Sequence, residues 1–245
     1  VDRDYVRPAL GPTIPLHCSD DFIRACRDLA REYDVGIQMH LAESKVQAVS
    51  GLKRYGKTLT AHLDDLGLLG TNFTGAHCVW LDDEDLKILS GHGACVADNP
   101  GSNLRLGNGI APARRMLELG VTLGIGTDGS SSADHQNMLE AMRMAALVSR
   151  IVDPDPESWL GRLVGSLVGT PGWARSCGLG SRLARPAPGA TARPGAAPPP
   201  LAPRPPPPPH SSPWLRLLRF SYAAAGQNDE CGSPRSRRSP SIAGV

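Results

Sequence analysis

Three short apolar runs, each ending at a polar side chain, constrain the fold of this chain most strongly. The runs occupy residues 35–39, 72–76 and 121–127. The first leads directly into His40, the second into His77 and the third into Asp128. Segments with helical periodicity separate the runs, so the strands are expected to be parallel and joined by crossovers. Parallel barrels carry their catalytic groups at the carboxyl ends of strands. The pattern therefore predicts an enzyme.

Strands and helices alternate throughout the first 150 residues. Strands are expected over residues 36–41, 73–79, 94–97 and 121–126, with a fifth ending near residues 10–15. Helices are expected over residues 19–33, 44–66, 82–90, 113–119 and 137–152. Gly51 and Gly56 are expected to break the second helix, and a Gly-rich loop is expected over residues 99–109. The apolar side of the last helix is expected to consist of Met138, Leu139, Met142 and Ala146.

These elements predict an α/β fold, a partial (β/α)8 TIM-like barrel with about strands 4 to 8 of the eight that close such a barrel. A doubly wound open sheet is the alternative. No expected strand is followed by G-x-G-x-x-G or G-x-x-x-x-G-K-S/T, which disfavours a nucleotide-binding open sheet. The barrel is therefore the preferred interpretation, and its amino-terminal half is expected to lie outside this sequence.

The composition of the chain changes after residue 160. Residues 1–160 carry 15 basic and 22 acidic side chains, whereas residues 161–245 carry 11 Arg, two acidic residues and 16 of the 23 prolines. A segment of the second kind cannot bury enough apolar surface to offset the entropy of ordering it. We therefore predict a partial barrel domain over residues 1–160 and a disordered, low-complexity Arg/Pro-rich tail over residues 161–245. The abrupt switch favours a shifted reading frame in GC-rich DNA over a true basic extension.

The cysteines and the absence of long apolar runs indicate a cytoplasmic protein. The six cysteines form no C-x-x-C pair, and no run of about 18 apolar residues occurs. The first residues, Val1 to Asp4, do not resemble a secretion signal. We therefore expect a reduced cytoplasmic setting without a membrane span. Because the first residue is not Met, the chain is expected to begin inside a longer protein.

Four motifs occur in an order and spacing that resembles the amidohydrolase superfamily. They are HLAE at residues 40–43, AHCV at 76–79, NPGSNLRLGNGIAP at 99–112 and GTDG at 126–129. Within the superfamily, residues 5–152 are similar to the group of cytosine deaminases, guanine or 8-oxoguanine deaminases and triazine hydrolases. The resemblance implies metal-dependent hydrolysis of carbon–nitrogen bonds other than peptide bonds. The expected reaction is deamination of a purine, pyrimidine, triazine or similar cyclic compound.

The resemblance also implies roles for four residues. His40 corresponds to a metal ligand, and His77 corresponds to a histidine that orients the attacking water or helps to bind the metal. Asp128 corresponds to the residue that contacts the metal and takes a proton from the water. Glu43 corresponds to the acid and base that protonates a ring nitrogen. The implied cofactor is one divalent metal ion, zinc in the first place and iron as the alternative.

Ordinary structural explanations remain for each candidate residue taken alone. A histidine at a strand end is commonly a hydrogen-bonded structural residue, and Glu43 could be a solvated residue in the first turn of a helix. Three further residues, Ser102, Asn103 and Arg105, are expected to line the substrate pocket, with ordinary loop hydrogen bonding as the alternative. The functional interpretation therefore depends on the joint placement of the residues at one end of the sheet.

Two departures from the family pattern leave other functions open. None of the seven histidines forms the His-x-His pair expected at the first strand, so the metal lacks its usual ligand count. His17 is a further candidate ligand. A catalytically inactive fragment is therefore one alternative. The other is an interaction module, in which the tail offers Pro-x-x-P segments to SH3-like partners or binds nucleic acid through the arginines at 216, 219, 235, 237 and 238.

Nucleic-acid binding is disfavoured because the tail has few aromatic residues and no known RNA- or DNA-binding motif. The expected partner is a small heterocyclic substrate, and homo-oligomers stay possible.

Overall fold

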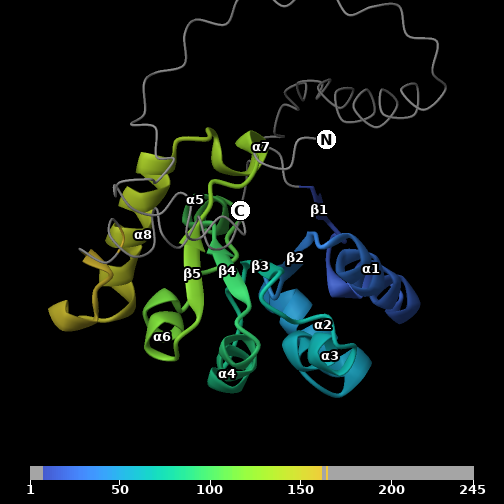
Figure 1. The fold of residues 1–245 in the computed structure, drawn as a ribbon. Helices are drawn as coiled ribbons and strands as arrows, with labels where there is room; N and C mark the ends of the chain where they lie inside the picture. The colour runs from blue at the N-terminus through green and yellow to red at the C-terminus, as the bar shows by residue number, and fades with distance from the viewer. Residues whose placement is uncertain (1–7, 162–163, 165–245) are drawn as a thin grey trace, which may run out of the picture. The chain divides into compact units, whose positions relative to one another are not determined.

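The computed structural model describes residues 8–161 and residue 164, all within the first of two compact units of the chain, residues 1–194. The strands of this part are β1 (Ala9–Leu10), β2 (Gly36–Leu41), β3 (Phe73–His77), β4 (Cys95–Asp98) and β5 (Thr122–Ile125). They pair in that order, and every pair is parallel (Figure 1). The strand order of a doubly wound sheet reverses at one point, whereas a barrel adds each strand to the same edge. The unbroken order confirms the partial barrel and excludes the open-sheet alternative.

Helices connect successive strands and line the sheet (Figure 1). They are α1 (Asp20–Tyr33), α2 (Lys45–Tyr55), α3 (Leu59–Asp65), α4 (Asp83–Gly91), α5 (Pro100–Arg105), α6 (Ala113–Glu118), α7 (Ser130–Ala133) and α8 (Met138–Val152). Two 3-10 turns, η1 (Pro15–His17) and η2 (Pro156–Ser158), complete the described elements. In Figure 1, α5 and α7 lie beyond the carboxyl ends of β4 and β5, at the edge where a barrel carries its active site.

Hydroxyl and carboxylate caps mark the starts of the first four α-helices. The hydroxyl oxygens of Ser19, Ser44 and Thr58 each accept a hydrogen bond from the backbone N–H three residues later. At the start of α4, Asp82 and Asp85 form a reciprocal capping box. Each cap satisfies a backbone donor that a helix start leaves unpaired, and such caps contribute about 1 kcal/mol. Local sequence therefore sets where α1 to α4 begin.

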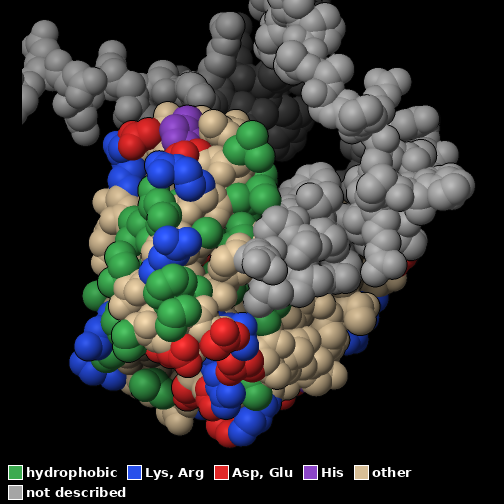
Figure 2. Space-filling view, turned by 90° about the vertical axis from the view of Figure 1, so that its left-hand side faces the viewer, with side chains coloured by type: hydrophobic (Ala, Val, Ile, Leu, Met, Phe, Trp, Pro, Cys, Tyr) green, Lys and Arg blue, Asp and Glu red, His purple; other side chains and the backbone are tan. Residues whose placement is uncertain are grey.

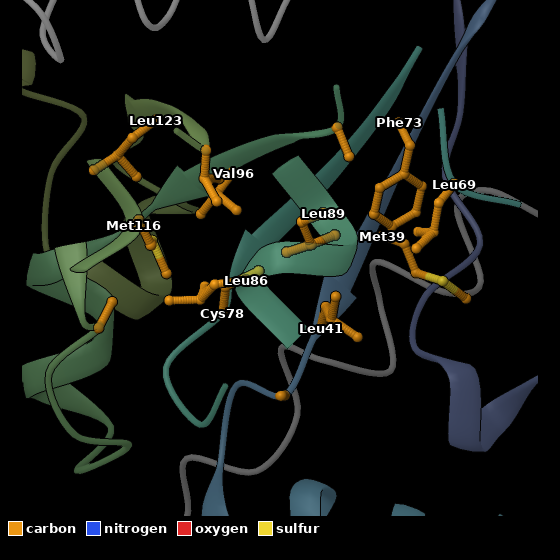
Figure 3. Packing of buried hydrophobic residues seen from close by; sticks show 14 of the residues in the cluster. Met39, Leu41, Leu69, Phe73, Cys78, Leu86, Leu89, Val96, Met116 and Leu123 are labelled. Carbon is orange, nitrogen blue, oxygen red and sulfur yellow. The ribbon is translucent and has the colours of Figure 1, made fainter. Parts of the chain in front are cut away.

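The core lies between the sheet and the helices. Alternate residues of β2, Ile37, Met39 and Leu41, are buried on the face that packs against this core, together with Phe73 of β3 (Figure 3). The residues between them point to the other face, and His40 is only half-buried there. Period-two alternation in a strand produces this division. The same alternation thus buries the apolar set and presents His40 on the opposite side of the sheet.

Three expectations about helices were wrong. Gly51 lies inside α2, where a Cβ atom would come within 2.7 Å of the Leu59 side chain, so glycine permits close packing of α2 and α3 rather than a break. The expected loop over residues 99–109 contains α5, which begins at Pro100, a residue favoured in a first helical turn. Leu139 was expected on the apolar side of α8, but it is 75% exposed. Figure 2 views the molecule from the side on which α8 lies in Figure 1, and hydrophobic side chains are visible on this surface.

Two sequence expectations concern parts of the chain that the structure does not cover. Apart from Gly161 and Val164, the predicted tail over residues 161–245 lies outside the described residues. The division into a domain over 1–160 and a tail therefore stays a prediction.

Among the described residues, no helix combines the length and the apolar character needed to cross a membrane.

Candidate active site

The carboxyl ends of β2, β3 and β5 bring His40, His77 and Asp128 together. The imidazole rings of His40 and His77 stack, with 5.2 Å between their centroids and 21° between their planes. Both rings act electrostatically on the Asp128 carboxylate. Residues distant in sequence therefore form one cluster, as their positions at strand ends of one parallel sheet predict.

The backbone takes an unusual conformation at these strand ends. Ala42 follows β2 with φ 46°, His77 ends β3 with φ 68°, Cys78 follows it with φ 52°, and Asp128 lies after β5 with φ 58°. Left-handed backbone costs about 1–2 kcal/mol for a residue with a Cβ atom, and such strain is concentrated at functional sites. Its occurrence beside each site-bearing strand supports a functional interpretation of this edge.

Each of the two histidines binds a carbonyl oxygen through its Nδ1 atom. His40 Nδ1 lies 3.0 Å from the backbone oxygen of Thr13, and His77 Nδ1 lies 2.8 Å from Oδ1 of Asn103. Because a carbonyl oxygen only accepts hydrogen bonds, Nδ1 must carry the proton in both neutral rings. The lone pair is then on Nε2 in each case. Metal-binding histidines show this arrangement, in which the second nitrogen donates to a neighbouring oxygen.

Asp128 is held in its ionised form. Its Oδ2 accepts a 2.6 Å hydrogen bond from the hydroxyl of Ser102, and its Oδ1 accepts a 2.7 Å bond from the backbone N–H of Gly129. Partial burial raises the pKa of Asp128, but these two hydrogen bonds together with His77 and His40 outweigh it and lower the pKa. Asp128 is therefore a carboxylate at neutral pH and is able to accept a proton.

Glu43 is fixed by two amide side chains. Its Oε1 accepts a 2.8 Å hydrogen bond from Nδ2 of Asn108, and its Oε2 accepts a 3.4 Å bond from Nε2 of Gln47. The Trp80 indole N–H donates in turn to the backbone oxygen of Asn108, at 2.7 Å. The loop after α5 therefore holds Glu43 from a position 65 residues further along the chain.

The three predicted substrate-binding residues lie on α5 rather than in a loop. Ser102 and Asn103 are buried, and their polar groups bind Asp128 and His77. Arg105 is exposed and forms an ion pair with Asp134. The first two residues therefore contact the candidate catalytic side chains directly. A substrate contact stays a prediction for all three.

Sequence reasoning missed two residues that support the site. Asp98 is the last residue of β4 and accepts a 3.0 Å hydrogen bond from Nδ2 of Asn103. The rule that singled out His40 and Asp128 would have found it, but the expected strand ended one residue too early. No local signal pointed to Asn108, because only the fold brings it to Glu43. His17, the further candidate ligand, is exposed on η1.

The donors at this edge fit a divalent metal ion in kind. Two imidazole Nε2 lone pairs and one carboxylate are ligands that zinc prefers, and catalytic zinc commonly has three protein ligands. Within residues 8–161 and 164, however, no three His, Cys, Asp or Glu side chains are close enough together to hold an ion as they stand. The described residues thus supply suitable donors but not a complete ligand cage.

Comparison with known proteins identifies the family. A model of the amidohydrolase family matches residues 2–162. The chain belongs to the amidohydrolase family. This confirms the resemblance inferred from the four motifs, all of which lie inside the matched region.

Two curated relatives of this chain are named as deaminases. The chain is 43% identical over 150 residues to a 5'-deoxyadenosine deaminase of Methanopyrus kandleri, covering 61% of this chain and 35% of the relative. It is 40% identical over 156 residues to a 5-methylthioadenosine/S-adenosylhomocysteine deaminase of Thermococcus kodakarensis, covering 64% and 37%. The chain thus spans little more than a third of the length of either relative.

Solved structures of the family resemble the described fold. An adenosine deaminase from Xanthomonas campestris with bound zinc has a TM-score of 0.68 and 29% identity, with 72% of this chain and 40% of that chain covered. The zinc complex of an atrazine chlorohydrolase from Arthrobacter aurescens TC1 has a TM-score of 0.65 and 33% identity, with 69% and 37% covered. Both likenesses agree with a partial barrel.

Proposed function

We propose that the protein to which this chain belongs is a metal-dependent deaminase, which replaces an amino group on a purine-like heterocycle with oxygen from water. The observation that carries the proposal is the cluster at the strand ends: His40 and His77, each with its lone pair on Nε2, beside the ionised Asp128. The relatives named as adenosine-derivative deaminases support the substrate class. Pyrimidines and triazines are the alternative substrate classes.

The residues that would supply ligands to the metal are His40, His77 and Asp128, although they do not form a complete ligand cage as they stand. Zinc is the preferred ion, supported by the zinc-containing structures of the two family members, and iron is the alternative. When bound, such an ion lowers the pKa of its water to about 7 and so supplies hydroxide at neutral pH.

The protein's own carboxyl groups divide the proton transfers. Asp128 is ionised, so it accepts a proton from the attacking water. Glu43 in its protonated form would give a proton to a ring nitrogen, because an aromatic ring resists nucleophilic addition until it is protonated. The proton taken up by Asp128 would then pass to the amino group, whose bond to carbon breaks to release ammonia, and the proton of the new hydroxyl would return to Glu43 as the oxo group forms. Asn108 and Gln47 hold the two oxygens of Glu43 in place during this transfer. His77 orients the water.

A substrate panel tests this proposal. The purified full-length protein with zinc is incubated with 5'-deoxyadenosine, methylthioadenosine, guanine, cytosine and an aminotriazine, and the products are identified by mass spectrometry. We expect ammonia and the corresponding oxo compound from at least one adenosine derivative. Absence of both products with every compound would contradict the proposal.

A second candidate is a catalytically inactive chain. The specific observation in its favour is the incomplete ligand cage of the described residues, together with the lack of a His-x-His pair in the whole sequence. Calorimetric titration with zinc separates the two candidates. An inactive chain is expected to bind no stoichiometric zinc at micromolar concentrations, whereas the proposed deaminase is expected to bind one ion.

A further inference from the structure

Asn103 links two other buried side chains, those of His77 and Asp98. Its Oδ1 lies 2.8 Å from Nδ1 of His77, and its Nδ2 lies 3.0 Å from Oδ1 of Asp98. His77 and Asn103 are each 1% exposed, and Asp98 is 5% exposed. Bulk water therefore does not compete for these hydrogen bonds, and each polar group depends on its protein partner.

The direction of this hydrogen-bonded chain is set at Asp98. An ionised carboxylate only accepts hydrogen bonds, so Asn103 must present its NH2 group to Asp98 and its oxygen to His77. The amide oxygen also only accepts, so His77 must carry its proton on Nδ1. Donor and acceptor roles thus leave one consistent arrangement, in which Nε2 of His77 has the lone pair.

His40 reaches the same tautomer in a different way. Its Nδ1 donates to the backbone oxygen of Thr13, which has no donor to offer in its place. The partner of His77 is instead a side-chain amide, whose oxygen and nitrogen exchange places when the group rotates by about 180°. The tautomer of His77 therefore depends on whatever holds the Asn103 amide, and the group hydrogen-bonded to the far end of that amide is Asp98.

We propose that Asp98 is a positioning residue, which acts through Asn103 to fix the tautomer of His77. The catalytic consequence of this inference rests on the proposed function, because Nε2 of His77 binds a metal ion or accepts a hydrogen bond from the attacking water only when it carries no proton. A purely structural role for Asp98 would leave the tautomer unchanged when the carboxylate is replaced. The two roles therefore differ in a property that is measurable without substrate.

Nitrogen NMR of the histidine rings measures this property directly. The full 245-residue chain is labelled with 15N-histidine and studied with a chelator at about pH 8.5, where imidazole is neutral and Asp98, whose pKa burial raises to about 7, is ionised. The His77 signals are those lost in His77→Gln. We expect the Nδ1–H tautomer in the unchanged protein, and an Nε2–H tautomer there would overturn the proposal without any further variant.

Asp98→Asn is the informative substitution because it keeps the size of the side chain. The Asp98 carboxylate accepts from Asn103 and also from the backbone N–H of Asn99, whereas an amide has only one oxygen for these two donors. Part of the molecules should therefore turn the Asn103 amide, and the Nε2–H tautomer of His77 should become detectable. Asp98→Leu, which removes the acceptor completely, should have the same effect.

Two controls separate the tautomer from general damage to the fold. The His40 signals should stay those of the Nδ1–H tautomer in every variant, because a backbone oxygen fixes that ring. Asp85→Asn, at another buried acid, should leave His77 unchanged. An unaltered His77 tautomer in folded Asp98→Asn would overturn the proposal. Because no substrate is used, failure of the deamination assay would leave this result standing, and the reverse also holds.

Discussion

The rings of His40 and His77 stack with 5.2 Å between their centroids, although 36 residues separate them in the sequence. Each ring donates through Nδ1 and keeps a lone pair on Nε2. The fold therefore places two potential metal-ligand nitrogens from neighbouring strands side by side.

Replacement of either ring should weaken metal binding. Co²⁺ serves as a visible substitute for zinc, and its absorption during titration gives the affinity. We expect His40→Gln and His77→Gln each to weaken Co²⁺ binding at least about 10-fold, since outer partners of ligands alone contribute 10–100-fold. His92→Gln is the matched control, because His92 binds Asp64 on the surface. Equal affinities in all four proteins would show that the stacked rings do not bind the metal.

The hydroxyl of Ser102 should set the acid limit of activity. Its hydrogen bond to Asp128 is one of the groups that lower the pKa of that carboxyl. In Ser102→Ala the pKa of Asp128 should rise, so this carboxylate takes up its proton at a higher pH than it does in the unchanged protein. The acidic limb of the kcat/KM profile should therefore move to higher pH, with the alkaline limb unchanged. A superimposable profile would contradict a base role for Asp128.

Asp98 should make the stability of the fold depend on pH. Burial raises its pKa to about 7, well above its ordinary value, despite hydrogen bonds from Asn99 and Asn103. The folded protein therefore holds a proton that the unfolded chain releases, and the free energy of unfolding should fall as pH rises from about 4 to about 7. Urea denaturation of Asp98→Asn should lack this contribution. A parallel pH dependence in the two proteins would contradict the buried-acid assignment.

A pair of glycine substitutions tests the packing of α2 against α3. A Cβ atom added to Gly51 would lie 2.7 Å from the Leu59 side chain, whereas a Cβ atom added to Gly91, at the end of α4, would meet nothing within 4 Å. Gly91→Ala should raise the free energy of unfolding by about 0.4–1 kcal/mol. Gly51→Ala should lower it by about 1–3 kcal/mol through overpacking. Stabilisation by both substitutions would show that Gly51 is not a packing residue.

Much of the fold follows from local patterns, and the supporting contacts of the site do not. The alternation in β2 and the Ser19 cap are visible in the sequence because each depends on neighbours within a few residues. Helix α5 could not be predicted from local sequence, because turn-forming residues surround it. Its Ser102 and Asn103 are buried in the fold.

The site itself divides in the same way. Strand ends locate His40, His77 and Asp128, because parallel strands bring their carboxyl ends to one edge. The hydrogen bond from Asn108 to Glu43 spans 65 residues, and nothing in either local sequence encodes it. Asp98 was missed because a strand boundary was placed one residue too early, and boundaries are the weakest part of pattern reading.

Ammonia release from adenosine derivatives by the zinc-loaded chain, with and without Glu43, tests the central claim most directly. The pair to compare is Glu43→Gln, which keeps the shape of the side chain, and Glu84→Gln, at an exposed glutamate paired with Lys87. We predict that Glu84→Gln deaminates like the unchanged protein, and that Glu43→Gln loses about 100-fold or more in kcat, within the range of general acid and base catalysis. Equal ammonia release by the two variants, or none by the unchanged zinc-loaded chain, would contradict the account.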